Sequence, residues 1–228
     1  MLKAALLIAA KDVTIVLMRG AGAWQAVLLG LVLIFLFSLS AGIGETPSPQ
    51  TAAVIFWMAT LFCQVLIYQT LYAAEEKNDA RAGLILMPVP LQSIWLGKLL
   101  AGALLLVLSQ CLFIPALFVF LAQTPGPSAP LALAALVLAD VGVCACGSLL
   151  GALSAGSGGK ESLLSIIVFP LLIPLLLAAI RLTAAGLSPD GADADAARWF
   201  GLAASFDCVF LGAGLFLFPH VYANGGGQ

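Results

Sequence analysis

Six long stretches of this chain are apolar on every side, and short connections that hold most of the polar residues separate them. A helix of about 20 apolar residues crosses a hydrocarbon core of about 30 Å. A membrane β-strand would instead alternate apolar and polar residues, and these stretches do not alternate. The pattern therefore predicts an all-α integral membrane protein with spans over 24–43, 52–74, 94–122, 130–153, 163–182 and 199–219.

The segment before the first span is shorter and more polar than a span. We expect residues 2–20 to form an amphipathic helix that lies in the membrane interface and leads into the first span. Its charged and apolar residues fall in opposite halves of a helical wheel: Lys3, Lys11, Asp12 and Arg19 against Leu2, Leu6, Val13 and Leu17.

The few charged residues decide the expected orientation. Hydrophobic residues make up 62% of the chain and charged residues 9%, so we expect a single transmembrane domain over residues 1–228 and no soluble domain. Basic residues favour the cytoplasmic side of a membrane. Seven Lys or Arg residues lie on one side of the predicted spans: in the amino-terminal segment, in the connections after spans two and four, and at Lys98 just after the first of these connections. The other side has two, Arg181 and Arg198. Both termini are therefore expected in the cytoplasm.

The connection over residues 75–90 is the most patterned polar segment. Five charged residues occupy positions 75–81, and an apolar run that ends at Pro88 follows them. A charged helix with an apolar end suits docking in a groove of a partner protein, and the same residues also suit a solvated hairpin. The candidate docking residues are Glu75, Glu76, Lys77, Asp79, Arg81, Leu84 and Met87.

Two pairs of prolines are expected to bend the chain. Pro88 and Pro90 should force a corner before the third span, because proline cannot continue a helix without losing a hydrogen bond. Pro170 and Pro174 lie within the fifth span and should kink it, either as a hinge or as a static bend.

Asp140 and Asp207 are carboxylic acids within predicted spans. An aspartate at the centre of a span costs about 2.5–3.5 kcal/mol on insertion scales, so each should face the bundle or a wet cavity. Each could serve proton coupling or line a polar path, or be a protonated aspartate hydrogen-bonded across helices.

Small residues recur every fourth position on two spans. Gly147 and Gly151 lie on the fourth span, and Gly97 lies on the third. They predict faces where helices pack closely, either within the bundle or across a dimer axis.

The sequence offers no catalytic or metal site. Residues 158–161 resemble a phosphate-binding loop, but Ser154 stands where its first glycine should be and Glu161 replaces the Ser or Thr. Residues 190–195 lack the glycine position and the closing glutamate of a calcium loop. The chain has one histidine, His220, with no evident nucleophile beside it, so we expect no enzymatic activity.

Two motif blocks resemble the CcmB family, the ABC-2-type haem-exporter permeases of cytochrome c maturation. One block is Gly-Leu-Ile-Leu-Met-Pro-Val-Pro at 83–90, followed by Leu-Gly-Lys-Leu at 96–99. The other is Gly-Lys at 159–160, followed by Leu-Ser-Ile-Ile-Val-Phe-Pro-Leu-Leu-Ile-Pro-Leu-Leu at 164–176. The resemblance covers nearly the whole chain and is most specific in the second block.

This resemblance implies a permease subunit at the bacterial inner membrane, present in two copies and driven by a separate ATPase, CcmA. It also implies the membrane partners CcmC and CcmD and the haem chaperone CcmE. Segment 75–87 would then be the cytoplasmic helix that docks on the ATPase. No cofactor is expected on this chain alone; ATP would bind the partner, and haem would be a cargo of the complex.

Three other functions fit the same residues. The chain could be an ABC-2 permease for another hydrophobic cargo, such as a lipid or a drug. It could be a scaffold that holds haem-handling partners without transporting anything. It could also be a proton-coupled carrier that uses Asp140.

Overall fold

The protein is described by a computed structural model that covers residues 1–19, 21–40, 46–76, 83–84, 86–155, 161–191 and 195–224. These segments form seven long helices, and six of them are long and apolar enough to cross a membrane. The helices are α1 (Leu2–Arg19), α2 (Ala21–Ser40), α3 (Pro49–Glu76), α5 (Leu91–Phe120), α6 (Ala129–Ala155), α7 (Glu161–Leu187) and α8 (Ala196–Asn224).

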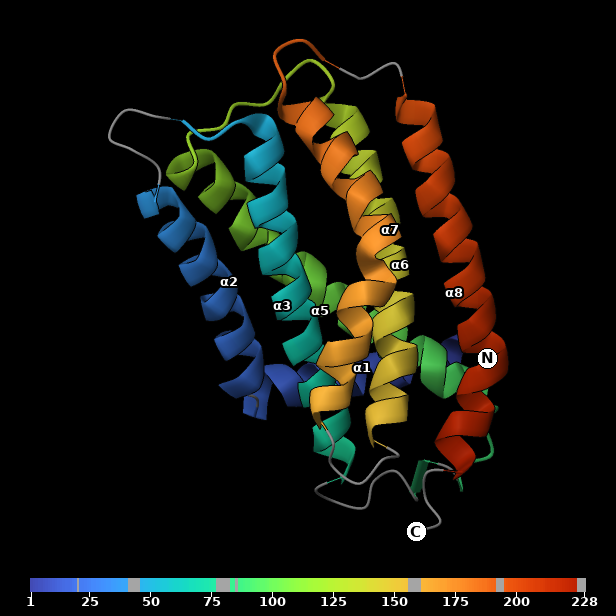
Figure 1. The fold of residues 1–228 in the computed structure, drawn as a ribbon. Coiled ribbons are helices and arrows are strands. Elements are labelled where there is room, and N and C mark those ends of the chain that lie inside the picture. The colour runs from blue at the N-terminus through green and yellow to red at the C-terminus, as the bar shows by residue number, and fades with distance from the viewer. Residues whose placement is uncertain are drawn as a thin grey trace.

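Six helices form an upright bundle, and α1 runs crosswise near one end of it (Figure 1). The end of α3, the start of α5, the end of α6, the start of α7 and the end of α8 lie at that same end. The ends of α2, α5 and α7 and the starts of α3, α6 and α8 lie at the opposite end (Figure 1). We call the first of these the coupling end, defined by Glu76 at the end of α3 and Leu91 at the start of α5.

The predicted all-α fold with six spans after an amino-terminal helix is confirmed. The helix boundaries differ most from the predicted ones at α7, which ends at Leu187, and at α8, which continues through Pro219 to Asn224. The extension of α8 is stabilised by packing, because Phe218 and Tyr222 are both fully buried and their rings stack 5.0 Å apart. The interfacial location of α1 stays a prediction.

Helix α3 is the centre of the bundle. It contacts α2, α5, α6 and α7, and its Trp57 and Tyr68 are among the largest fully buried side chains. Trp57 also donates a hydrogen bond from Nε1 to Thr183 Oγ1 on α7, at 3.0 Å. The connection over residues 77–90 therefore leaves directly from the most enclosed helix of the protein.

The outer faces of the bundle carry large apolar side chains. Leu28 and Val32 on α2 and Phe216 and Leu217 on α8 are exposed on the isolated chain. Exposed apolar surface of this extent is unfavourable in water and favourable against lipid tails. These faces are suited to the hydrocarbon core of a bilayer.

Candidate functional site

The apolar residues of the predicted docking segment are partly buried and partly exposed. Leu84 is buried in the hydrophobic core, whereas Leu86 is 85% exposed and Met87 is 45% exposed. The exposed pair extends from the coupling end as an apolar tip. Lys77, Asp79 and Arg81 lie outside the described residues, and so does the side chain of Glu76.

Pro88 and Pro90 lie in a tight corner between the docking segment and α5. The Met87 N–H donates to the Leu84 carbonyl at 3.3 Å, and the Val89 N–H donates to the Met87 carbonyl at 2.8 Å. Pro90 has φ −64° and ψ 139°, an extended conformation, and α5 begins at the next residue. Proline favours this position because its fixed φ suits the entry to a helix and its missing N–H costs nothing there.

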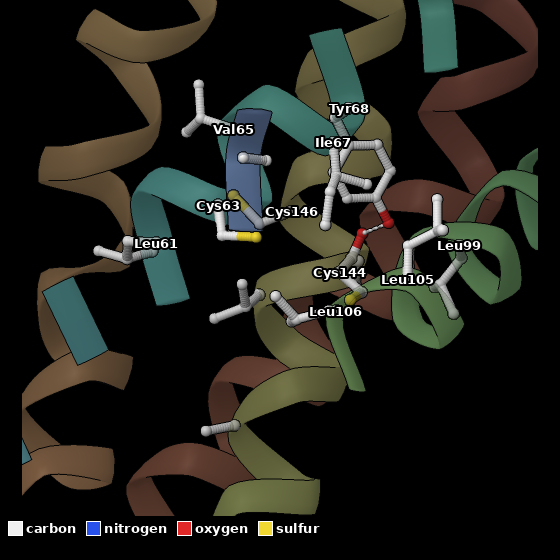
Figure 2. Packing of buried hydrophobic residues seen from close by; sticks show 14 of the residues in the cluster. Leu61, Cys63, Val65, Ile67, Tyr68, Leu99, Leu105, Leu106, Cys144 and Cys146 are labelled. Atoms are coloured by element: carbon white, nitrogen blue, oxygen red, sulfur yellow. Dashed lines mark hydrogen bonds between the residues drawn. The ribbon is translucent and has the colours of Figure 1, made fainter. Parts of the chain in front are cut away.

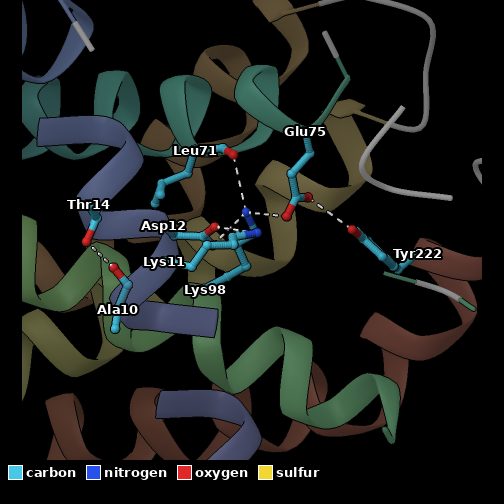
Figure 3. A network of polar contacts seen from close by, with 8 residues as sticks. All are labelled: Ala10, Lys11, Asp12, Thr14, Leu71, Glu75, Lys98 and Tyr222. Atoms are coloured by element: carbon cyan, nitrogen blue, oxygen red, sulfur yellow. Dashed lines mark hydrogen bonds and ion pairs between the residues drawn. The ribbon is translucent and has the colours of Figure 1, made fainter. Parts of the chain in front are cut away.

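Glu75 does not belong to the exposed part of the docking segment, and this corrects the sequence prediction for that residue. Its side chain is buried, and Oε1 lies 2.6 Å from Nζ of Lys98 on α5 (Figure 3). A buried carboxylate must be paired, and Lys98 is the cation that its position on α3 brings within reach. Glu75 therefore stabilises the protein's interior and is not available to a partner.

Asp12 on α1 is the second carboxylate beside Lys98. Its Oδ2 lies 2.9 Å from Lys98 Nζ, and its Oδ1 lies 2.9 Å from Nζ of the partly exposed Lys11 (Figure 3). The helical wheel placed Asp12 in the charged half of this helix, but in the structure the Asp12 side chain is buried. The apolar residues Leu2, Leu6 and Leu17 instead lie on the exposed side of α1.

Helix α8 joins this group through Tyr222. The Tyr222 hydroxyl donates to Glu75 Oε2 at 3.0 Å (Figure 3). Lys98 also donates to the backbone carbonyl of Leu71 at 3.2 Å. We call Lys11, Asp12, Glu75, Lys98 and Tyr222 the Lys98 cluster; it draws on α1, α3, α5 and α8 at the coupling end.

The Lys98 cluster is electrically balanced and tightly enclosed. Lys98 has no exposed surface, and its three N–H groups meet two carboxylates and one carbonyl. Two lysines face two carboxylates, so the net formal charge of the cluster is zero. Removing one partner from such a buried pair typically costs about 3–5 kcal/mol, because the remaining charge is left uncompensated.

Sequence reasoning missed this cluster because it read each charge separately. Lys98 counted only toward orientation, and Asp12 only toward the amphipathic helix. One signal was available: Asp12, Glu75 and Lys98 each interrupt an apolar helix near the same predicted membrane surface. Charges in such positions tend to pair with one another.

A ladder of hydrogen bonds joins α3 to α6 beside the cluster. Figure 2 shows one rung, in which the Tyr68 hydroxyl donates to the Cys144 carbonyl at 3.0 Å. Gln64 and Tyr72 donate to the carbonyls of Val143 and Ser148, each at 2.7 Å. The Tyr72 ring centroid also lies 5.2 Å from Lys98 Nζ, so the ladder adjoins the charged cluster.

The predicted packing glycines all face neighbours within this chain. A Cβ at Gly147 would lie 2.2 Å from Gln64 Nε2, and one at Gly151 would lie 2.4 Å from the Tyr72 ring. A Cβ at Gly97 would lie 2.8 Å from Cγ2 of Ile8 on α1. These glycines allow α3 to approach α6 and α1 to approach α5.

The two intramembrane aspartates have different surroundings. Asp140 on α6 accepts a hydrogen bond from Gln110 Nε2 on α5 at 2.7 Å. Asp207 on α8 is buried against α6, where a Cβ at Gly142 would lie 2.2 Å from its Oδ1. Within the described part of the chain neither oxygen of Asp207 has a hydrogen-bond donor.

Pro170 and Pro174 lie on the outward side of α7, which continues through both of them. Leu172 and Leu175, between and beside them, are fully buried against the bundle. The helix therefore tolerates both prolines without ending. Whether this part of α7 acts as a hinge stays a prediction.

The coupling end brings several of these features together. The described residues contain no group of three or more His, Cys, Asp or Glu side chains that could hold a metal ion. The end of α3, the start of α5, the apolar tip of Leu86 and Met87, and the Lys98 cluster lie at one end of the membrane bundle.

Comparison with known proteins gives a family match over most of the chain. The family model described as "CcmB protein" matches residues 3–222. "Heme exporter protein B" of Paracoccus denitrificans (strain Pd 1222) is 29% identical over 182 residues, which cover 78% of this chain and 83% of the relative. "Heme exporter protein B" of Pseudomonas aeruginosa PAO1 is 27% identical over 189 residues, 81% of this chain and 84% of the relative.

Proposed function

Because the chain belongs to the CcmB protein family, we propose that it is the permease subunit of a haem-export complex for c-type cytochrome biogenesis. The observation that carries this proposal is the extent of the match, which runs from the first turn of α1 into the last turn of α8. The chain is a component of a transporter and is not itself an enzyme. It works as a multi-pass membrane protein within a larger complex.

The energy source is a separate ATPase subunit, CcmA. The membrane proteins CcmC and CcmD and the haem chaperone CcmE complete the set of partners, and two copies of this chain form the membrane core. This chain alone binds no cofactor; ATP binds the ATPase, and haem is a cargo of the complex. The complex lies in the bacterial inner membrane, with both termini of this chain in the cytoplasm.

The ATPase binds the segment between α3 and α5. Leu86 and Met87 are the described apolar side chains that extend from the coupling end, so they are suited to fill a groove on the ATPase. The corner at Pro88 and Pro90 holds this tip at a fixed distance from α5. ATP-driven closure would then displace the ends of α3 and α5 together.

The experiment that tests this function replaces the apolar tip with charge. Leu86→Asp combined with Met87→Asp should abolish binding of the ATPase subunit and the assembly of c-type cytochromes, because an aspartate in an apolar groove is desolvated without a partner. The measurements are co-purification of the ATPase subunit and the amount of haem-containing cytochrome c in cells that lack the wild-type chain.

Thr124→Asp is the matched control, because Thr124 is exposed in the connection at the opposite end of the bundle. It should leave both measurements unchanged. Normal ATPase binding and normal cytochrome assembly with the Leu86 and Met87 variant would contradict the proposed docking site.

A further inference from the structure

An ion pair of the Lys98 cluster joins the two helices, α3 and α5, that flank the connection over residues 77–90. Glu75 precedes the connection and Lys98 follows it, and the two side chains meet at 2.6 Å. The Glu75–Lys98 ion pair therefore adds to the packing between α3 and α5 on the two sides of this connection.

The same ammonium group also holds α1. Asp12 Oδ2 lies 2.9 Å from Lys98 Nζ, and close packing at Gly97, one residue earlier, holds Ile8 of α1 against α5. The carboxylate and the ammonium are both nearly without exposed surface, so separating them would leave two poorly hydrated charges. Apolar contacts can slide past one another, but a buried ion pair of this kind resists sliding.

We propose that Asp12 and Lys98 make α1 part of the force-transmitting machinery, so that α1 moves with the coupling segment when the partner ATPase binds ATP. Lys98 acts as a positioning residue: it contacts neither ATP nor cargo, and it fixes the end of α3, the start of α5 and α1 as one body. Helix α8 also meets this body, where the Tyr222 hydroxyl donates a hydrogen bond to Glu75.

This inference rests on the proposed function, since it needs an ATPase that binds the connection. The inference predicts a specific effect of removing one charge. Loss of the Asp12 charge should loosen α1, which would then be held on α5 by packing alone, and should leave the Glu75–Lys98 pair in place. ATP hydrolysis should then continue with a much smaller movement of α1.

The test measures α1 directly in the assembled complex with its ATPase. Spin labels are placed at Leu7→Cys on α1 and Val137→Cys on α6, both exposed positions, after Cys111 and Cys208 have been changed to Ala. Pulsed electron paramagnetic resonance then gives the distance between the labels with and without ATP. In the otherwise unchanged chain, ATP should shift this distance.

Asp12→Asn should remove most of that shift while the complex still hydrolyses ATP. Lys3→Met is the matched control, because it removes a charge from the exposed side of the same helix and should leave the shift intact. If Asp12→Asn does not fold, the triple variant Asp12→Asn, Glu75→Gln and Lys98→Met takes its place. It leaves no buried charge unpaired, and it should also lose the shift.

Two results would count against the inference, and they differ from failure of the proposed function. A folded Asp12→Asn or triple variant with a normal shift would mean that the cluster only stabilises the fold. ATP hydrolysis without any shift in the unchanged chain would mean that α1 is not moved at all. A reconstituted complex that does not hydrolyse ATP would instead overturn the proposed function, and the inference with it.

Discussion

Asp140 and Asp207 are both buried carboxyl groups within apolar helices, yet the described residues provide a hydrogen-bond donor for only one of them. Asp140 joins α6 to α5 through Gln110, which fits the sequence interpretation of an aspartate hydrogen-bonded across helices. Asp207 lies against the backbone of α6 near Gly142, where a side chain larger than hydrogen could not fit. The role of Asp140 is therefore the easier one to test by substitution.

The first prediction concerns this bond between α5 and α6. Asp140→Leu should lower the free energy of unfolding by about 1–2 kcal/mol, because an interhelical hydrogen bond in a membrane averages about 0.6 kcal/mol and the Gln110 amide is left without its acceptor. Asp140→Asn should cost less, because the amide oxygen can still accept from Gln110. Unfolding of the purified protein in mixed micelles by increasing denaturing detergent measures both values.

Gln110→Leu supplies the control for the Asp140 prediction. If the two side chains act as a pair, the double variant Asp140→Leu and Gln110→Leu should be less destabilised than the sum of the single variants. Cytochrome assembly should persist with Asp140→Asn. Complete loss of assembly by a folded Asp140→Asn protein would instead support proton coupling at this residue.

Individual residues also show where sequence reasoning stopped. It predicted that Asp140 and Asp207 face the bundle or a wet cavity, because the cost of exposing a carboxylate to lipid is large. It could not predict that Lys98 pairs with Asp12 and Glu75, because those pairings depend on how three helices cross. Depth in the membrane can be read from sequence, but rotation of a helix about its own axis is set by its neighbours.

At the scale of elements, the close approach of α3 and α6 depends on two glycines. Gln64, Tyr68 and Tyr72 recur every fourth residue on α3, and their hydrogen bonds reach carbonyls of α6 only because no side chain intervenes at Gly147 and Gly151. The spacing of small residues predicted a packing face. The tyrosines and the glutamine opposite that face could not be paired with it from one sequence.

The second prediction follows from this packing. Gly147→Ala and Gly151→Ala should each destabilise the protein by about 1–3 kcal/mol, since the new methyl group overlaps a side chain that is held by a hydrogen bond. Thermal unfolding in detergent measures the effect.

Gly201→Ala is the matched control for this substitution. Gly201 is a helical glycine on α8, and a Cβ there meets no atom within 4 Å. This variant should be neutral or slightly more stable, because alanine favours a helix over glycine by about 1 kcal/mol. Equal effects at Gly151 and Gly201 would mean that helix propensity, rather than the contact with α3, decides the outcome.

At the scale of the whole molecule, the number and order of the membrane helices could be predicted because the bilayer imposes both. Each span needs a minimum apolar length, and successive spans must alternate in direction. The structure accordingly places the ends of α3, α6 and α8 at one end of the bundle and the ends of α2, α5 and α7 at the other (Figure 1). An interfacial helix over residues 2–20 could be predicted, but its packing mainly against α5 needed the structure.

The third prediction fixes the orientation of the whole molecule. Of the nine Lys and Arg residues in the sequence, Arg181 and Arg198 belong to helix ends at the face opposite the coupling end. The bias of the other seven therefore predicts that the coupling end faces the cytoplasm. Met87→Cys should react with a membrane-impermeant maleimide only after the inner membrane is opened, whereas Thr124→Cys should react in intact spheroplasts.

The labelling needs a background in which the exposed Cys111 and Cys208 are changed to Ala, while the buried Cys63, Cys144 and Cys146 remain. The reverse pattern, with Met87→Cys labelled from outside, would contradict more than the orientation. ATP is available only on the cytoplasmic side, so an ATPase could not then reach Leu86 and Met87. The docking site and the transmission through Lys98 would both lose their source of force, and the bundle would have to be driven from its other end.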